Sequence, residues 1–164
     1  MPVTVGIDPG SRVTGYGVVE QRGRDILYID SGVVRNRSSS SRPERLHRIK
    51  KVLDEVLRRH SPAALAVEQI FIVKNPKSIF VLGEVRGVVL LAAAEAGVPV
   101  YEYSPREVKS SVVGRGAATK GQVAAMIQRL LKVGHTPETE DETDALAVAF
   151  CHVLRDSGFT GGLR

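Results

Sequence analysis

Four acidic residues of this 164-residue chain stand where carboxylates could act together. Asp8 ends an alternating apolar segment at residues 3–8, and Glu68 ends a second apolar segment at residues 64–68. Asp141 and Asp144 are three positions apart, which places them on one face of a helix. Grouped carboxylates repel one another unless a divalent cation neutralises them, and oxygen ligands suit Mg²⁺ or Mn²⁺. Two such ions about 4 Å apart activate a water and stabilise the leaving oxygen in phosphodiester cleavage.

Each acid also has a purely structural interpretation when it is taken alone. The acids between residues 138 and 144 lie at or near a helix start, where the helix dipole favours negative charge. Asp8 precedes Pro9-Gly10 and has the sequence context of a turn residue. Glu68 is harder to explain in this way, because a carboxylate that ends an apolar strand needs a partner. Both interpretations therefore stay open on these residues alone.

The expected order of strands and helices would bring the four acids to one end of a sheet. Strands are predicted at residues 3–8, 13–20, 25–34, 64–68 and 100–103. Helices are predicted to follow the capping residues Ser41, Asn75, Ser104 and Thr119 and the pair Thr136-Pro137. The first three strands should form an antiparallel meander, and the later strands should run parallel with crossover helices. This order predicts an α/β fold with a mixed five-stranded sheet and helices on both faces.

The composition excludes several classes of protein. Lys and Arg number 23 against 18 Asp and Glu, and the net charge of +5 favours a polyanionic partner. The single cysteine, Cys151, allows no internal disulfide and no cysteine metal cluster, and it indicates a reducing compartment. The longest apolar runs are too short to span a bilayer, and the N-terminus is not typical of a signal peptide. We expect one domain over residues 1–164, with the last few residues as a flexible tail.

Four segments carry a family resemblance, and they occur in the family's order and spacing. They are GIDPGSRVTGYGVV at residues 6–19, VEQIFIVKNPKS at 67–78, VKSSVVGRGAATKGQV at 108–123 and DETDALAVA at 141–149. Over essentially the whole chain, the sequence resembles the RuvC family of Holliday junction resolvases. The resemblance implies an RNase H-like fold. It also places the family's four catalytic and metal-binding carboxylates at Asp8, Glu68, Asp141 and Asp144.

The activity implied by the resemblance is that of a metal-dependent crossover junction endodeoxyribonuclease. A homodimer would resolve four-way DNA junctions in recombination and repair by symmetric paired nicks. Hydrolysis by metal-activated water would leave 5′-phosphate and 3′-hydroxyl ends, with two Mg²⁺ ions per active site and Mn²⁺ as a substitute. The resemblance also implies the RuvA-RuvB branch-migration complex as a partner. The implied location is the bacterial cytoplasm, at the nucleoid during repair.

Five further residues are candidates for contact with DNA. The resemblance places phosphate-binding or catalytic lysines at Lys109 and Lys120. Lys74 and Arg115 are secondary candidates for contacts to the DNA backbone, which would give affinity rather than sequence readout. Phe71 follows Glu68 on a loop, where it could either enter the core or stack on bases as a wedge at an opened junction. The resemblance favours the wedge.

The helix expected at residues 75–96 is apolar nearly all round. A helix of this kind must be buried on all sides. The sheet would cover one face, and a second subunit is the natural cover for the other, with Gly83 and Gly87 allowing close approach. The alternative is a core helix in a monomer.

Other functions remain open on the residues alone. Asp8-Pro9-Gly10 with Gly15 also resembles the phosphate-binding turn of the actin and sugar-kinase superfamily, which needs two such domains and does not account for Asp141 and Asp144. An RNase H-type nuclease acting on another nucleic acid is a second alternative, and a non-catalytic junction-binding module is a third. His135 lies close in sequence to the acidic helix and is a minor candidate for the site.

Overall fold

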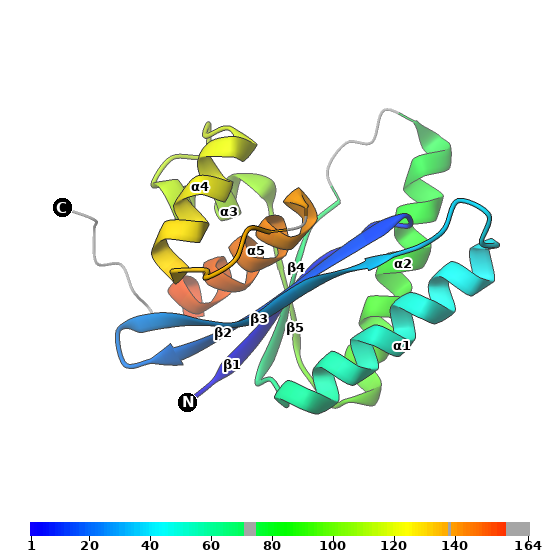
Figure 1. Cartoon of the computed structure of the whole chain (residues 1–164), viewed down its shortest axis with the longest axis horizontal. Helices are drawn as coiled ribbons and strands as arrows, with labels where there is room; N and C mark the ends of the chain where they lie inside the picture. Colours follow the sequence, from blue (N-terminus) through cyan, green and yellow to red (C-terminus); the bar gives the residue numbers. More distant parts are fainter. Residues whose placement is uncertain (71–74, 138, 157–164) are drawn as a thin grey trace.

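A mixed five-stranded sheet runs through the molecule, in the order β3-β2-β1-β4-β5 (Figure 1). The computed structural model describes residues 1–70, 75–137 and 139–156. The strands are β1 (Val3–Asp8), β2 (Val13–Arg22), β3 (Asp25–Arg35), β4 (Ala64–Glu68) and β5 (Val100–Tyr103). The first three strands pair antiparallel, whereas β4 runs parallel to both β1 and β5. The predicted sheet is therefore confirmed.

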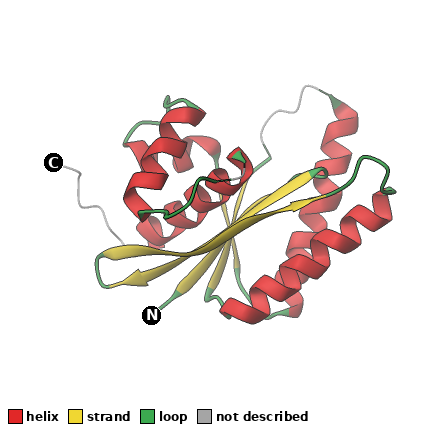
Figure 2. Ribbon diagram, in the orientation of Figure 1, coloured by secondary structure: helices red, strands yellow, loops and turns green. Residues whose placement is uncertain are grey.

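Helices cover both faces of the sheet, as Figure 2 shows. One face carries α1 (Arg42–His60) and α2 (Pro76–Glu95), and the other carries α3 (Pro105–Val113), α4 (Lys120–Leu131) and α5 (Glu140–Asp156). Helix α5 lies directly on the strands, and α3 and α4 pack against α5. Each face has its own buried apolar cluster, so the sheet separates two cores. None of the helices in the described ranges is long and apolar enough to cross a membrane.

The polar residues at the helix starts act as the sequence predicts. The Ser41 hydroxyl accepts a hydrogen bond from the backbone N–H of Glu44, and the Glu44 carboxylate accepts one from the backbone N–H of Ser41. Ser104 makes the same reciprocal capping box with Glu107 at α3, and Thr119 makes it with Gln122 at α4. These bonds satisfy backbone donors that the first helical turn leaves unpaired. The cap at Thr119 fixes where Lys120 enters its helix.

The predicted start of the last helix is wrong. Thr136-Pro137 does not begin α5, which starts at Glu140. Proline is compatible with a first helical turn but does not compel one. The later start places Glu140, Asp141 and Glu142 in the first turn, where the helix dipole stabilises negative charge.

Glycines in two strands let α5 lie unusually close to the sheet. A Cβ atom added to Gly6 of β1 would stand 2.1 Å from the backbone oxygen of Ala145. A Cβ atom added to Gly17 of β2 would stand 2.7 Å from the backbone nitrogen of Leu146. Both distances are shorter than any real Cβ contact, so only glycine fits these two positions without a shift of the helix. The face of β1 that carries Gly6 and Asp8 is thus the face on which α5 packs.

Candidate active site

Asp8 and Glu68 lie side by side at the carboxyl ends of two parallel strands. Ile7 of β1 pairs with Val67 of β4, and the two acids are the next residues of their strands. Each acid is half-buried. In sheets of this kind, ligands bind beyond the carboxyl ends of the parallel strands. The position of the pair therefore suits a binding site.

The other two acids come from the first turns of α5, which crosses the same end of the sheet. Gly15, the β2 partner of Asp8, lies beneath the backbone of Asp141. Asp144 follows one helical turn later and forms an ion pair with Lys120, with 3.1 Å between Nζ and Oδ2. The Asp144 side chain is 19% exposed and that of Lys120 is 69% exposed, so the pair stands at the rim of the site.

Burial and the neighbouring charges both perturb the pKa of Asp8. Burial raises the pKa of this carboxyl most, and the negative charges of Asp144, Asp141 and Glu68 raise it further, to about 8. The ammonium group of Lys120 acts in the opposite direction. All four acids predicted from the sequence therefore interact in one place. A cation that binds in such a setting strongly stabilises the ionised form of the carboxyl group.

Burial and neighbouring charges also shift the pKa values of two other acids and one lysine of the site. Burial raises the pKa of Glu68, with a further contribution from Asp144, whereas Lys120 and Lys109 lower it. Burial also raises the pKa of Asp144, and Lys120 opposes this effect. The carboxylate of Asp144 in turn raises the pKa of Lys120. Lys109 on α3 thus supplies positive charge near Glu68, and Lys120 on α4 supplies it near Asp8, Glu68 and Asp144.

The donor set fits a hard divalent cation, because it consists of carboxylate oxygens that repel one another. Within the ranges that the structure describes, however, no three His, Cys, Asp or Glu side chains stand close enough together to hold a metal ion. The acids interact across the end of the sheet without meeting at ligand distance. Holding a cation would require their carboxylate groups to come closer together, and the Lys120 ammonium would have to share Asp144 with it.

The remaining candidates for DNA contact divide into two groups. Lys109 is half-buried on α3, and Arg115 is exposed in the connection between α3 and α4. Both lie on the α5 side of the sheet, together with Lys120. Phe71 and Lys74 lie outside the described residues, so their predicted roles stay predictions.

The outer face of α2 is apolar and open to solvent. Phe80 is 75% exposed, Leu91 53% and Ile79 46%. Gly83 and Gly87 would each accept a Cβ atom with nothing within 4 Å. Other side chains of the same helix, such as Val85, are fully buried against the sheet. The helix is therefore covered on one side only in the single chain.

Sequence reasoning treated Glu142 only as one of several acids at a helix start and missed its structural role. This side chain is buried, with 1% exposure, and its Oε1 lies 2.5 Å from Ser31 Oγ and 2.7 Å from His135 Nε2. The spacing held a signal, because Glu142 stands four positions before the fully buried Leu146 on α5. An acid on that face must find buried partners.

A hollow at the other end of the molecule is separate from this site. It is lined by the last turns of α1 and α2 and by the chain that follows each helix, including Leu57, Pro62, Ala92 and Val98. These residues flank the start of β4, whereas Glu68 ends that strand. The hollow contains none of the four acids.

Comparison with known proteins gives one consistent result. The profile of the family described as "Crossover junction endodeoxyribonuclease RuvC" matches residues 4–152. A crossover junction endodeoxyribonuclease RuvC of Shewanella amazonensis is 47% identical over 152 residues, which cover 93% of this chain and 87% of that protein. The protein of the same name from Vibrio cholerae serotype O1 is 48% identical over 152 residues, with the same coverage.

The fold agrees with a solved structure of the same family. Thermus thermophilus RuvC in complex with Holliday junction substrate matches with a TM-score of 0.91 and 37% sequence identity, covering 98% of each chain. The RNase H-like arrangement expected from the sequence resemblance is confirmed by this match.

Proposed function

Since the chain belongs to the RuvC family of crossover junction endodeoxyribonucleases, we propose that it resolves four-way DNA junctions. It would do so in recombination and repair, by paired symmetric nicks that leave 5′-phosphate and 3′-hydroxyl ends. One observation carries the proposal: burial, together with the negative charges of Asp144, Asp141 and Glu68, raises the pKa of Asp8 to about 8. A non-catalytic junction-binding module would have no use for four repelling carboxylates. Residues 1–164 would act as one nuclease domain.

We assign the catalytic and metal-binding roles to Asp8, Glu68, Asp141 and Asp144. These carboxylates would hold two Mg²⁺ ions, with Mn²⁺ as a substitute. When bound, the ions supply activation of the attacking water and stabilisation of the leaving oxygen. The carboxylates fix the ions at the end of the sheet, and burial of Asp8 keeps bulk water from screening their charges.

The basic residues would orient the DNA rather than choose its sequence. Lys120 stands beside Asp144 with most of its side chain exposed, so it can contact a phosphate next to the acids. Lys109 lowers the pKa of Glu68 and supplies a second positive charge there. Arg115 and Lys74 would add contacts to the DNA backbone, and Phe71 would stack on bases at the junction centre. Such contacts give affinity that falls with salt.

The partners follow from the same argument. We propose a homodimer through the apolar face of α2, because Phe80 and Leu91 are exposed there. Two symmetric nicks need two active sites, which a dimer provides. The RuvA-RuvB branch-migration complex is the further partner that we propose from family membership. The proposed location is the bacterial cytoplasm, at the nucleoid during repair.

Cleavage of three matched substrates tests the proposal against its rivals. The parent protein with Mg²⁺ is given a four-way DNA junction, a linear duplex of the same sequence and an RNA–DNA hybrid. We expect paired nicks in the junction and little cleavage of the others. Preferential cleavage of the hybrid would favour an RNase H-type nuclease. Tight junction binding without cleavage of any substrate would favour a binding module, and either result would contradict the proposal.

A further inference from the structure

A buried acid lies between the two site carboxylates of α5 and is not part of the proposed metal-binding set. Glu142 follows Asp141 directly and precedes Asp144 by two positions. Its side chain is among the largest that are fully buried, and it faces β3. A buried carboxylate is expensive unless hydrogen-bond donors satisfy it. The partners of Glu142 therefore show which segments of the chain this side chain connects.

Two donors from different parts of the chain converge on one oxygen of this acid. Ser31 of β3 donates its hydroxyl to Glu142 Oε1 at 2.5 Å. His135, in the connection between α4 and α5, has its Nε2 at 2.7 Å from the same oxygen, to which it donates in the tautomer that carries the proton on Nε2. The contacts join a strand at the edge of the sheet, the chain before α5 and the first turn of α5. Hydrogen bonds to a charged group are shorter and stronger than neutral ones.

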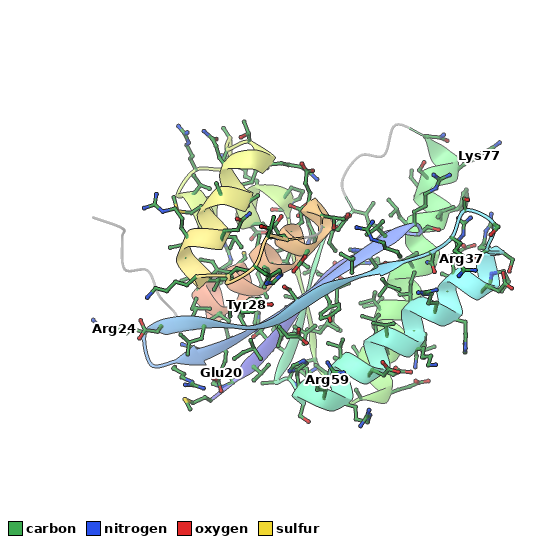
Figure 3. The ribbon with its side chains drawn as sticks, viewed as in Figure 1. Glu20, Arg24, Tyr28, Arg37, Arg59 and Lys77 are labelled. Atoms are coloured by element: carbon green, nitrogen blue, oxygen red, sulfur yellow. The ribbon has the colours of Figure 1, made fainter. Side chains whose placement is uncertain are left out.

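Tyr28 supports the same contacts from β3. Its hydroxyl lies 3.1 Å from Ser31 Oγ, and its ring packs at a tilt against the ring of His135, with 5.8 Å between the centroids. Figure 3 shows Tyr28 on the side of β3 where α4 and α5 lie. The hydroxyl of Ser31 and the ring of His135 are therefore both held in place by Tyr28.

The position of Glu142 explains how these contacts reach the proposed active site. The glycines of β1 and β2 let α5 approach the sheet, but a glycine contact alone does not stop the helix from sliding or turning. Glu142 is bonded to β3, on the far side of β2 from Asp8. It gives the first turn of α5 a second fixed point. Any rotation of that turn would move Asp141 and Asp144 together.

We propose that Ser31, His135 and Glu142 form a positioning set, which holds the first turn of α5 so that Asp141 and Asp144 face Asp8 and Glu68. The inference rests on the proposed function, because it concerns the placement of the proposed metal-binding acids. Misplacement of reacting groups by about 1 Å can lower a rate by about 100-fold. The set needs no contact with DNA to affect cleavage.

The test uses variants of the two donors, because the full chain should fold without them. The His135 side chain is 44% exposed, so His135→Ala removes a contact without opening a core cavity. Ser31→Ala removes the other donor. His60→Ala is the matched control: His60 Nε2 bonds Asp30 Oδ2 at 3.0 Å, a His–carboxylate pair that links β3 to α1 on the other face of the sheet.

Three measurements separate positioning from simple stability. They are kcat for junction cleavage, Kd for the junction, and the Mg²⁺ concentration at the midpoint of the Tm increase without DNA. We expect His135→Ala and Ser31→Ala each to lower kcat about tenfold or more and to raise the Mg²⁺ midpoint, with Kd changed less than about twofold. The fold-loss of kcat in the double variant should be smaller than the product of the two single fold-losses, since both residues act through Glu142.

Two results would overturn the inference. One is that folded His135→Ala and Ser31→Ala keep the parental kcat and Mg²⁺ midpoint, even if Tm falls. The other is that His60→Ala shows the same losses. If the parent itself does not cleave junctions, the proposed function fails instead, and the Mg²⁺ midpoints still decide whether these residues position the acids.

Discussion

A Cβ atom added to Gly15 would stand 2.0 Å from the backbone oxygen of Asp141. Gly15 pairs with Asp8 across the β1–β2 ladder, so the missing side chain on one strand permits the acid of a distant helix to lie beside the acid of the next strand. Residues 8 and 141 are far apart in sequence, and Gly15 lets the backbone of residue 141 approach the strand beside Asp8. The contact between Gly15 and Asp141 therefore packs the helix on the sheet, and it is also required for Asp141 to lie near Asp8.

Gly15→Ala should displace the first turn of α5 and so disrupt the site. The added methyl group meets backbone atoms, which cannot rotate away as a side chain can, so α5 must shift. We expect a loss of about 1–3 kcal/mol in unfolding free energy and a large loss of cleavage. Gly121→Ala in α4 is the control, because a Cβ there meets nothing within 4 Å. Denaturant unfolding that leaves Gly15→Ala as stable as the parent would count against the close packing.

The raised pKa of Asp8 predicts a pH dependence for the metal-free protein. Its pKa is about 8 in the folded state, against about 4 for an unfolded chain. Between these values the folded protein holds a proton that the unfolded chain releases, so this group lowers stability as pH rises from about 4 to about 8. Asp8→Asn removes the effect. With a chelator present, its Tm should therefore rise relative to the parent between about pH 5 and about pH 8.

Mg²⁺ should raise the Tm of the parent more at high pH than at low pH, because a cation competes with the proton for Asp8. The Tm increase that a fixed Mg²⁺ concentration produces should be larger near pH 8.5 than near pH 6. Equal increases at both values would show that Asp8 does not take part in binding the ion.

Phe80→Glu should dissociate the proposed dimer without unfolding the chain. Phe80 is 75% exposed on α2, so the charge meets water in the monomer and an apolar surface in the dimer. Leu130→Glu on α4 is the control, since Leu130 is an exposed leucine away from that face. Sedimentation should show a dimeric parent and control and a monomeric Phe80→Glu. A monomeric parent at micromolar concentration would remove the basis of the interface.

Lys120→Gln should lower cleavage far more than stability. The ion pair with Asp144 is largely exposed on the lysine side, and such pairs add only about 0–1 kcal/mol to stability. Next to Asp144, Asp8 and Glu68, however, the ammonium supplies charge that no neutral side chain replaces. We expect at least about a tenfold loss of kcat. Lys50→Gln, which removes an ion pair with Asp54 and Glu95 on the other face, should cleave at the parental rate.

Local signals in the sequence predicted the elements well. The capping residues Ser41 and Ser104 act at the helix starts where they were expected, and β4 and β5 have the predicted bounds. Capping depends on residues three positions apart, and strand alternation depends on the nearest neighbours. Both are visible in one sequence. The four acids were singled out from the same kind of signal, because Asp8 and Glu68 end predicted strands and Asp141 and Asp144 lie near the start of a predicted helix. Their catalytic role stays a prediction.

Relationships between distant segments could not be predicted from the pattern. The start of α5 was placed at Thr136-Pro137, although Glu140 begins the helix and Glu142 anchors its first turn to Ser31. That anchor depends on β3, more than 100 positions earlier in the chain. Nor could the sequence reveal that the acids stop short of ligand distance, with Lys120 paired to Asp144. Side-chain rotation among repelling charges is decided by the folded environment.

The central claim is that the four convergent acids cleave DNA while the basic surface binds it, and Asp8→Asn tests this claim most directly. The amide keeps the size of the carboxyl group but removes the charge that three other acids surround. Cleavage rate and junction affinity are measured on the same preparations with Mg²⁺ present. We expect cleavage to fall by at least about 100-fold while Kd for the junction stays within a few-fold of the parent. Cleavage within a few-fold of the parental rate would contradict the account.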